Sequence, residues 1–343
     1  MSTDTYEILA VKYAERLDRF RAESFITPEA DDHATPHPMD YFVWVVRNSD
    51  RTILVDTGFD EAEGRKRNRR VLRAPATALE LIGLSAASVD QLVVTHLHYD
   101  HAGTLGAFPK AHFHLQAAEM AYATGPCMCH PQLRGPFTAD HVCEMVRHVY
   151  SGRVVFHDGD AEIAPGISVH RIGGHRRGLQ CVRVATAGGP VVLASDASHY
   201  YENFETGRVF PIVVDVEDTL LGYARLTALA ASRRHIVPGH DPLVLDMYKN
   251  LGGASVMLRH FARMHEGVKL YREAERILRE FKLKDQWYIK PTEKDGRGWG
   301  ATEAIRGALC HWIEIQGGKI KNYQIIAPTT WNVGPRTSDG ARG

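Results

Sequence analysis

The chain has 343 residues, of which 44% are hydrophobic and 24% charged, a composition typical of a globular protein with room for about two domains. Its 41 basic and 41 acidic residues give a formal net charge of 0, which offers no argument for a nucleic-acid partner. The first twenty positions are interspersed with charges, no apolar stretch approaches ~18 residues, and the five cysteines show no disulfide pattern, so we expect a cytoplasmic protein without membrane contact.

The first informative element is a short apolar run over residues 51–55, which predicts a strand that ends in the turn Asp56-Thr57-Gly58. A second predicted strand, residues 92–95, is followed at once by a dense group of metal-binding side chains. This group, all within six residues, consists of His96, His98, Asp100 and His101. Residues two apart on a helix point in different directions. An extended or turning backbone can instead direct the first two toward one point and the last two toward another.

Three further candidate ligands also follow predicted strands. His175 comes after residues 167–172, Asp196 after residues 191–195, and His240 after residues 235–239. Sites on α/β sheets are generally built from loops at strand ends. We expect a binuclear site in which one ion is held by His96, His98 and His175, the second by Asp100, His101 and His240, with Asp196 as the bridge. Imidazole and carboxylate ligands suit two Zn²⁺ or similar divalent ions, and the open coordination positions predict hydrolytic chemistry.

This pattern resembles the metallo-β-lactamase superfamily. The resemblance rests on His-x-His-x-Asp-His, the three later ligands and the Asp-Thr-Gly turn, and it covers roughly residues 1–247. It implies an α/β (α+β) fold, a four-layer αββα sandwich, with the site at the edges of the two sheets and Asp56 supporting the ligands through hydrogen bonds. Within the superfamily, residues 173–180, 196–198, 202–205 and 237–242 most resemble the N-acyl homoserine lactonases.

The resemblance implies a zinc-dependent hydrolase that opens the lactone ring of N-acyl homoserine lactones (quorum quenching) by attack of a metal-bridging hydroxide. Asp100 is the expected general acid for the leaving alkoxide. Several lactonases of this group carry a tyrosine three residues after the bridging aspartate. Here His199 stands at that position, followed by Tyr200, and either side chain is a candidate donor to the carbonyl of the acyl lactone substrate. The alternative is another ester or thioester hydrolase of the superfamily.

The chain changes character near residue 248. Residues 1–248 hold 24 basic and 31 acidic residues, whereas residues 249–343 hold 17 and 10. Apolar residues at spacings of three or four predict a helix over residues 258–281, a glycine-rich loop follows at 295–300, and a hairpin is predicted from residues 311–316 and 319–326, joined by Gly317-Gly318. We therefore expect two domains, residues 1–247 and 248–343.

The second segment resembles a fragment of the nickel–iron hydrogenase large subunit, through residues 298–307, His311-Trp312 and residues 323–332. Hydrogenases bind nickel and iron through two Cys-x-x-Cys pairs, and this chain contains none, with Cys310 the only cysteine of the segment. We expect no nickel–iron site and no catalytic role for this fused segment. A scaffold that binds a redox partner through it is the alternative function, and its apolar stripe favours self-association.

Overall fold

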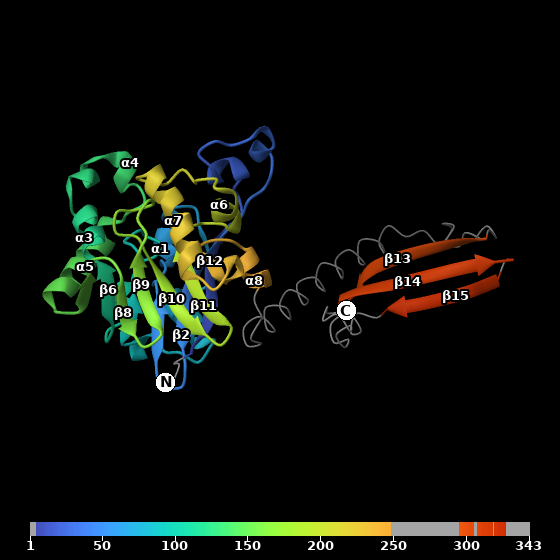
Figure 1. Ribbon diagram of the computed structural model, residues 1–343, viewed down its shortest axis with the longest axis horizontal. Coiled ribbons are helices and arrows are strands. Elements are labelled where there is room, and N and C mark those ends of the chain that lie inside the picture. Colours follow the sequence, from blue (N-terminus) through green and yellow to red (C-terminus); the bar gives the residue numbers. More distant parts are fainter. Residues whose placement is uncertain (1–4, 248–294, 305–306, 318, 327–343) are drawn as a thin grey trace, which may run out of the picture. The chain divides into compact units, whose positions relative to one another are not determined.

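The computed structural model describes residues 5–247, 295–304, 307–317 and 319–326 (Figure 1). The chain forms two compact units, residues 1–254 and residues 255–343. The helix expected over residues 258–281 lies outside the described residues. Within the part that is described, no helix is both long and apolar enough to cross a membrane.

The first unit contains two β-sheets with helices on their outer faces (Figure 1). The larger sheet has the strand order β4-β1-β2-β3-β5-β6-β7 and the smaller one the order β12-β11-β10-β9-β8. The strands of the larger sheet are β1 (Glu7–Arg16), β2 (Met39–Arg47), β3 (Thr52–Val55), β4 (Arg70–Val71), β5 (Gln91–Val93), β6 (His112–Gln116) and β7 (Val154–His157). Those of the smaller sheet are β8 (Ala161–Ala164), β9 (Ile167–Arg171), β10 (Gln180–Thr186), β11 (Gly189–Ser195) and β12 (Ile236–Pro238).

Helices complete the outer layers. One hydrophobic core joins the larger sheet to α2, α3 and α5, and a second joins the two sheets to each other and to α6, α7 and α8. The α-helices of the first unit are α1 (Glu61–Lys66), α2 (Pro75–Glu80), α3 (Ala117–Ala123), α4 (Pro131–Arg134), α5 (Ala139–Tyr150), α6 (Tyr201–Thr206), α7 (Val216–Leu229) and α8 (Leu243–Met247). Single 3₁₀ turns are η1 (Arg21–Ser24), η2 (Ala30–His33), η3 (Ala86–Ser88), η4 (Leu105–Ala107), η5 (Pro126–Cys129) and η6 (Arg233–His235). This is the αββα order that the resemblance implied.

The interior strand β2 shows why residues 41–46 form an unbroken apolar run. Val43 and Val45 lie in the core under the helices, while Trp44 and Val46 lie in the core between the sheets. Successive side chains of a strand point to opposite faces, so a strand covered on both faces needs apolar residues at every position. Burial of each such side chain contributes about 1.5–3 kcal/mol.

Parallel pairing places the ligand-bearing loops side by side. Strands β3 and β5 are parallel neighbours, so the turn at Asp56 lies beside the loop that starts at Val94, and the Asp56 N–H donates to the carbonyl of Val93 at 2.8 Å. Strands β11 and β12 are also parallel, which brings Asp196 close to His240. The predicted ligands therefore follow strand ends at one edge of the sandwich.

The second unit contains a three-stranded antiparallel sheet formed by β13 (Gly296–Ala304), β14 (Gly307–Gln316) and β15 (Lys319–Ile326). The predicted hairpin is confirmed, with Gln316 opposite Lys319. The predicted loop at residues 295–300 is wrong, because these residues pair with β14 from Gly296 onward. Glycine disfavours strands only weakly, and a hydrogen-bonded partner outweighs that preference.

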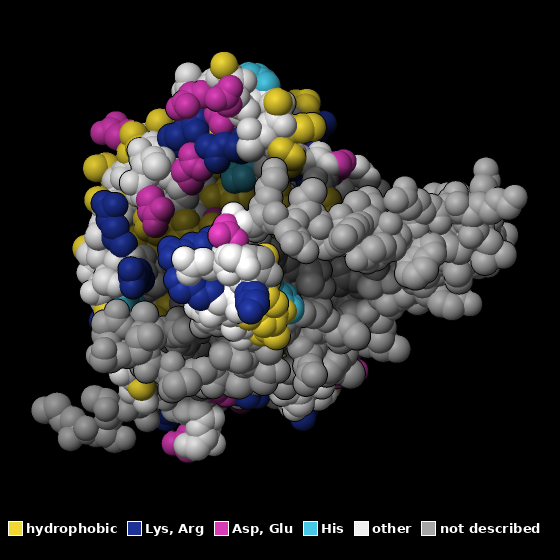
Figure 2. All heavy atoms as spheres, turned by 90° about the vertical axis from the view of Figure 1, so that its right-hand side faces the viewer, with side chains coloured by type: hydrophobic (Ala, Val, Ile, Leu, Met, Phe, Trp, Pro, Cys, Tyr) yellow, Lys and Arg dark blue, Asp and Glu magenta, His cyan; other side chains and the backbone are white. Residues whose placement is uncertain are grey.

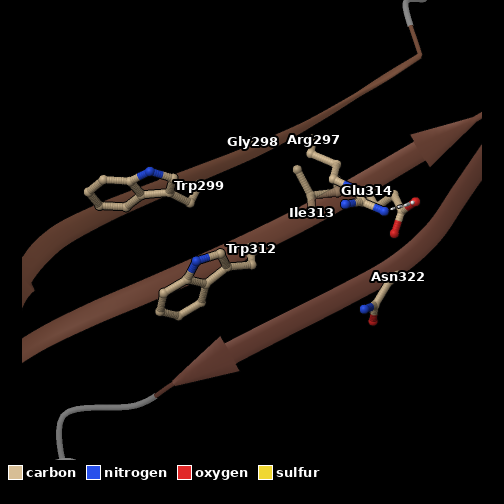
Figure 3. A pocket seen from close by; sticks show the side chains of 7 residues that line it. All are labelled: Arg297, Gly298, Trp299, Trp312, Ile313, Glu314 and Asn322. Carbon is tan, nitrogen blue, oxygen red and sulfur yellow. Dashed lines mark hydrogen bonds and ion pairs between the residues drawn. The ribbon is translucent and has the colours of Figure 1, made fainter.

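One face of this sheet carries two tryptophans. Trp299 and Trp312 are direct cross-strand partners, and they line a pocket together with Arg297 and Glu314 (Figure 3). The Arg297 guanidinium lies 3.2 Å from the Glu314 carboxylate. Trp299 is 71% exposed. None of the predicted metal ligands lies in this unit.

We expect a chain shortened to residues 1–254 to bind as much metal as the full chain, because all seven predicted ligands and both hydrophobic cores belong to the first unit. Elemental analysis of both proteins checks this, with about two ions per chain expected for a binuclear site. A shortened protein that folds, by circular dichroism, but holds less metal would contradict the expectation.

Candidate metal centre

The structure brings all seven predicted ligands together at the edge of the sandwich. Every one of them is buried, and their ligand atoms form groups whose members lie within 4.8 Å of one another. The first group consists of His96, His98, His175 and Asp196, the second of Asp100, His101 and His240, and a third of Asp196, His199 and His240. The first two are the sets expected from the sequence for the two ions.

Asp196 lies between the groups, with one carboxylate oxygen toward each. Its Oδ2 is 3.3 Å from Nε2 of His175 and 3.8 Å from Nε2 of His96. Its Oδ1 is 3.2 Å from Nε2 of His101 and 2.9 Å from Nε2 of His240. A carboxylate that faces two ligand sets in this way has the geometry of a bridge between two ions.

Unpaired polar atoms support the same assignment. Asp196 Oδ1 and His101 Nε2 are buried and have no hydrogen-bond partner among the described residues. Most buried polar atoms in proteins are hydrogen-bonded, so each exception needs an explanation. Both atoms are candidate metal ligands within the cluster, and a divalent cation would satisfy both.

Burial and neighbouring charges shift the pKa values of the predicted histidine ligands. Burial holds the pKa of His96 and of His175 well below the usual value, which keeps these rings in the neutral form that binds metal. Burial also lowers the pKa of His101, but the carboxylates of Asp196 and Asp56 outweigh it and raise that pKa well above its usual value. The second group therefore strongly attracts positive charge, either a proton or a metal ion.

Hydrogen bonds to the outer ring nitrogens direct the inner nitrogens toward the cluster. His101 Nδ1 donates to Asp56 Oδ2 at 2.7 Å, His240 Nδ1 to the Asp40 carbonyl at 2.8 Å, and His175 Nδ1 to the Ile212 carbonyl at 2.5 Å. Each bond places a ring proton on Nδ1 and directs Nε2 toward the cluster, where it can bind metal. Such partners fix the orientation of metal-ligating histidines.

Asp56 is the central supporting residue, as the resemblance implied. Its Oδ1 accepts from the Thr95 N–H at 2.8 Å and from the Thr95 hydroxyl at 2.9 Å, while Oδ2 holds His101. Its backbone has φ +63°, a left-handed conformation that aspartate and asparagine tolerate better than most residues. The turn thereby directs the carboxylate back under the ligand loop.

Sequence reasoning missed Arg176. This guanidinium is 2% exposed, donates to Nε2 of His98 and to the carbonyl of His175 at 2.8 Å, and lies 5.5 Å from the centre of the Phe137 ring. The only signal in the sequence is its position directly after His175. An arginine in a loop is usually exposed, as its neighbour Arg177 is, so composition could not have identified it.

The two candidate substrate contacts differ in their surroundings. His199 Nε2 lies 3.0 Å from Asp196 Oδ2, and its ring stacks on Phe210 with centroids 3.8 Å apart. The Tyr200 hydroxyl accepts from the Arg19 guanidinium at 2.6 Å and donates to the Pro38 carbonyl at 3.1 Å. His199 therefore faces the cluster, whereas the Tyr200 hydroxyl is bound to the N-terminal part of the chain.

The profile of the metallo-beta-lactamase superfamily matches residues 38–284. A relative from Mycobacterium tuberculosis, the probable metallo-hydrolase Rv2300c, is 30% identical to this chain over 252 residues, which cover 60% of this chain and 75% of the relative. These matches confirm the resemblance inferred from the ligand pattern.

Solved structures confirm the fold. An N-acyl homoserine lactone hydrolase, solved with the product N-hexanoyl-L-homoserine at its catalytic metal centre, has a TM-score of 0.58 at 21% identity, covering 73% of this chain and 98% of that one. A dizinc quorum-quenching lactonase, AidC, has a TM-score of 0.54 at 15% identity, covering 69% and 87%. At these identities the likeness establishes the sandwich fold.

The end of the chain matches a different family. The profile of the nickel-dependent hydrogenases covers residues 241–343. The uptake hydrogenase large subunit of Rhodobacter capsulatus is 49% identical over 59 residues, which are 17% of this chain. The match spans only 10% of that subunit, and it confirms the resemblance to a fragment of it.

We expect Asp56→Asn to weaken metal binding by roughly 10–100-fold, the usual effect of removing a hydrogen-bond partner of a ligand. Asparagine tolerates the positive φ, so the turn should persist, but an amide N–H would face the N–H of His101 if the amide took the position of Oδ2. Competition with a chromogenic chelator measures the affinity. Asp158→Asn, a change at a side chain that is 90% exposed, is the matched control. Equal affinities for Asp56→Asn and the control would refute the supporting role.

Proposed function

Because the chain belongs to the metallo-β-lactamase superfamily of hydrolases, we propose that it is a binuclear zinc enzyme that opens N-acyl homoserine lactones. The observation that carries the proposal is the position of Asp196, with one oxygen toward each histidine group. Two ions at such a site would lower the pKa of a bound water, so that it supplies hydroxide near neutral pH, and would polarise the carbonyl as a Lewis acid. Both effects accelerate the hydrolysis of a lactone, which is a cyclic ester.

Asp100 is the residue best placed to handle the proton. Its Oδ2 lies 3.8 Å from Nε2 of His101 and 3.8 Å from Nε2 of His240, and its side chain is 10% exposed, the most accessible of the candidate carboxylates. The Tyr13 hydroxyl donates to its backbone carbonyl at 3.0 Å and fixes the loop. Ring opening releases an alkoxide, and Asp100 would carry the proton from the attacking water to that oxygen.

His199 is the better-placed candidate for the substrate carbonyl. Its ring is 4% exposed, faces Asp196, and is held flat against Phe210. Tyr200 already uses its hydroxyl in two hydrogen bonds within the protein. An imidazole N–H directed at the carbonyl oxygen would stabilise the negative charge that develops there.

Two observations favour a lactone over other esters. The lactone hydrolase structures match over nearly their whole length, and one of them holds a ring-opened product at its metal centre. The segment after Asp196, with Glu202, Asn203 and Phe204, forms α6 in this chain and is the part of the sequence that most resembles those lactonases. Other ester and thioester hydrolases of the superfamily share the metal ligands, but the resemblance in this segment is to the lactonases.

The zinc-loaded protein should release one proton per ring opened from N-acyl homoserine lactones, measured in a pH-stat against simple esters and thioesters. We expect lactones to have the highest kcat/KM, because the segment that contains α6 is the part of the sequence that most resembles the lactonases. A preference for thioesters or open-chain esters would assign the alternative hydrolase.

We expect Asp100→Asn to lower kcat by ~10²–10⁴-fold, the usual contribution of a positioned acid or base. An amide keeps the size and an oxygen ligand for metal but cannot carry the proton. Metal content measured alongside separates the two effects. Full activity in a variant with full metal content would show that another group handles the proton.

A further inference from the structure

Residues 17–38, here named the clasp, form a closed loop beside the candidate site. The N–H of His37 donates to the carbonyl of Arg19 at 2.8 Å, and the N–H of Arg21 to that of Thr35 at 2.9 Å. The clasp contains η1 and η2 and lies beside α6, the helix that begins directly after Tyr200 (Figure 1). None of these residues belongs to the predicted set of metal ligands.

Four alternating charges fasten the clasp to α6 and its following loop. Arg21 makes two bonds to the Glu202 carboxylate, at 2.6 and 2.7 Å, and a third to Asp32 at 2.8 Å. Arg208 closes the ring of charges, with 2.6 Å to Asp32 and 3.2 Å to Glu202. Acidic and basic side chains lie side by side in this upper part of the described surface (Figure 2).

This ion cluster is better shielded than an ordinary surface pair. The four side chains are only 5% to 27% exposed, and the guanidinium carbons of Arg21 and Arg208 lie 5.2 and 3.7 Å from the centre of the buried Phe25 ring. Bidentate arginine–carboxylate bonds have defined directions. The cluster can therefore fix the position of α6 as well as hold two segments together.

A second set of contacts reaches from the clasp to the residue after His199. Arg19 donates to the hydroxyls of Ser24 and Tyr200 at 2.7 and 2.6 Å. The ring of His37 stacks on Tyr200 with centroids 4.0 Å apart, and Tyr200 donates to the Pro38 carbonyl. Residues at both ends of the clasp therefore contact the side chain of Tyr200.

We propose that the clasp is a positioning device for the proposed reaction, and that Arg21 and Glu202 hold the turn 196–200 so that His199 stays beside Asp196. The His199 ring contacts Phe210 and Asp196 and lies edge-on to the rings of His175 and His240, and its carbonyl accepts from the N–H of His240 at 3.0 Å. Its neighbour Tyr200 has the firm anchors. The inference rests on the proposed function, since His199 is a substrate contact only there.

The kinetic test uses the zinc-loaded full chain. Arg21→Gln and Glu202→Gln should each lower kcat/KM for the lactone on the order of tenfold, a coupling typical of one ion network, with metal content unchanged. The loss should fall on the same parameter, kcat or KM, as in His199→Phe. Because Arg21 acts through His199, Arg21→Gln should add nothing in the His199→Phe background. Additive losses, or no loss, overturn the proposal.

Amide hydrogen exchange gives a reading that does not depend on turnover. Arg21→Gln and Glu202→Gln should speed exchange in peptides covering residues 196–206. Arg65→Gln is the matched control, because it removes an ion pair with Glu61 of 2.9 Å whose side chains are 69% and 74% exposed. This control should leave exchange and kcat/KM unchanged.

The outcomes separate the clasp from the proposed function. Unchanged exchange at residues 196–206, or an equal rise throughout the first unit, overturns the positioning role, the latter showing a general loss of stability. If the wild-type protein opens no lactone and yet exchange rises only at residues 196–206, the hold of the clasp on the turn stands and the proposed substrate fails.

Discussion

A buried carboxylate surrounded by imidazoles is the constraint on which this structure depends. Asp196 loses its hydration, and only positive charge nearby makes that tolerable. The carboxylate lies within 4 Å of five histidine rings, so the ends of β5, β11 and β12 have little freedom. Gly239, directly before His240, shows how closely the loop after β12 approaches Asp196. A Cβ there would lie 2.9 Å from the backbone of Ser195 and 3.0 Å from Asp196 Oδ1, so only glycine fits without displacing the Asp196 carboxylate.

One of the hydrogen-bonded contacts between the two sheets at this edge is made by the hydroxyl of Thr95. Thr95 Oγ1 donates to the Asp56 carboxylate, and it also lies 2.8 Å from the Ser195 hydroxyl at the end of β11. Thr95 precedes His96 and Ser195 precedes Asp196, so this contact helps to fix the distance between a predicted ligand of the larger sheet and the predicted bridge on the smaller sheet. Polar groups that are held in advance need no rearrangement when charge develops, which is the condition for electrostatic catalysis.

The sequence predicted the parts of the site that are local in the chain. Each ligand follows a short apolar run, and the runs at residues 92–95 and 235–239 are the strands β5 and β12 to within two residues. The supporting groups could not be predicted in the same way. Arg21 and Glu202 lie 181 positions apart, and no local pattern indicates that two charged residues at such a distance share a hydrogen bond. Residues 295–300 show the converse, because the partner strand β14 outweighs their glycine content.

The histidine at position 199 ties the proposed substrate donor to the state of the bridge. Burial lowers the pKa of His199, so the ring is neutral and carries a single N–H. In the structure Nε2 lies 3.0 Å from Asp196 Oδ2, and Nδ1 has no hydrogen-bond partner among the described residues. The one N–H can therefore serve Asp196 or a substrate carbonyl, and engagement of Asp196 by metal would favour the second. A tyrosine hydroxyl here would carry its own proton independently of the bridge. In the proposed reaction, a histidine at this position would make the donor conditional on an occupied site, and a clasp that holds the turn in place would keep that donor beside Asp196.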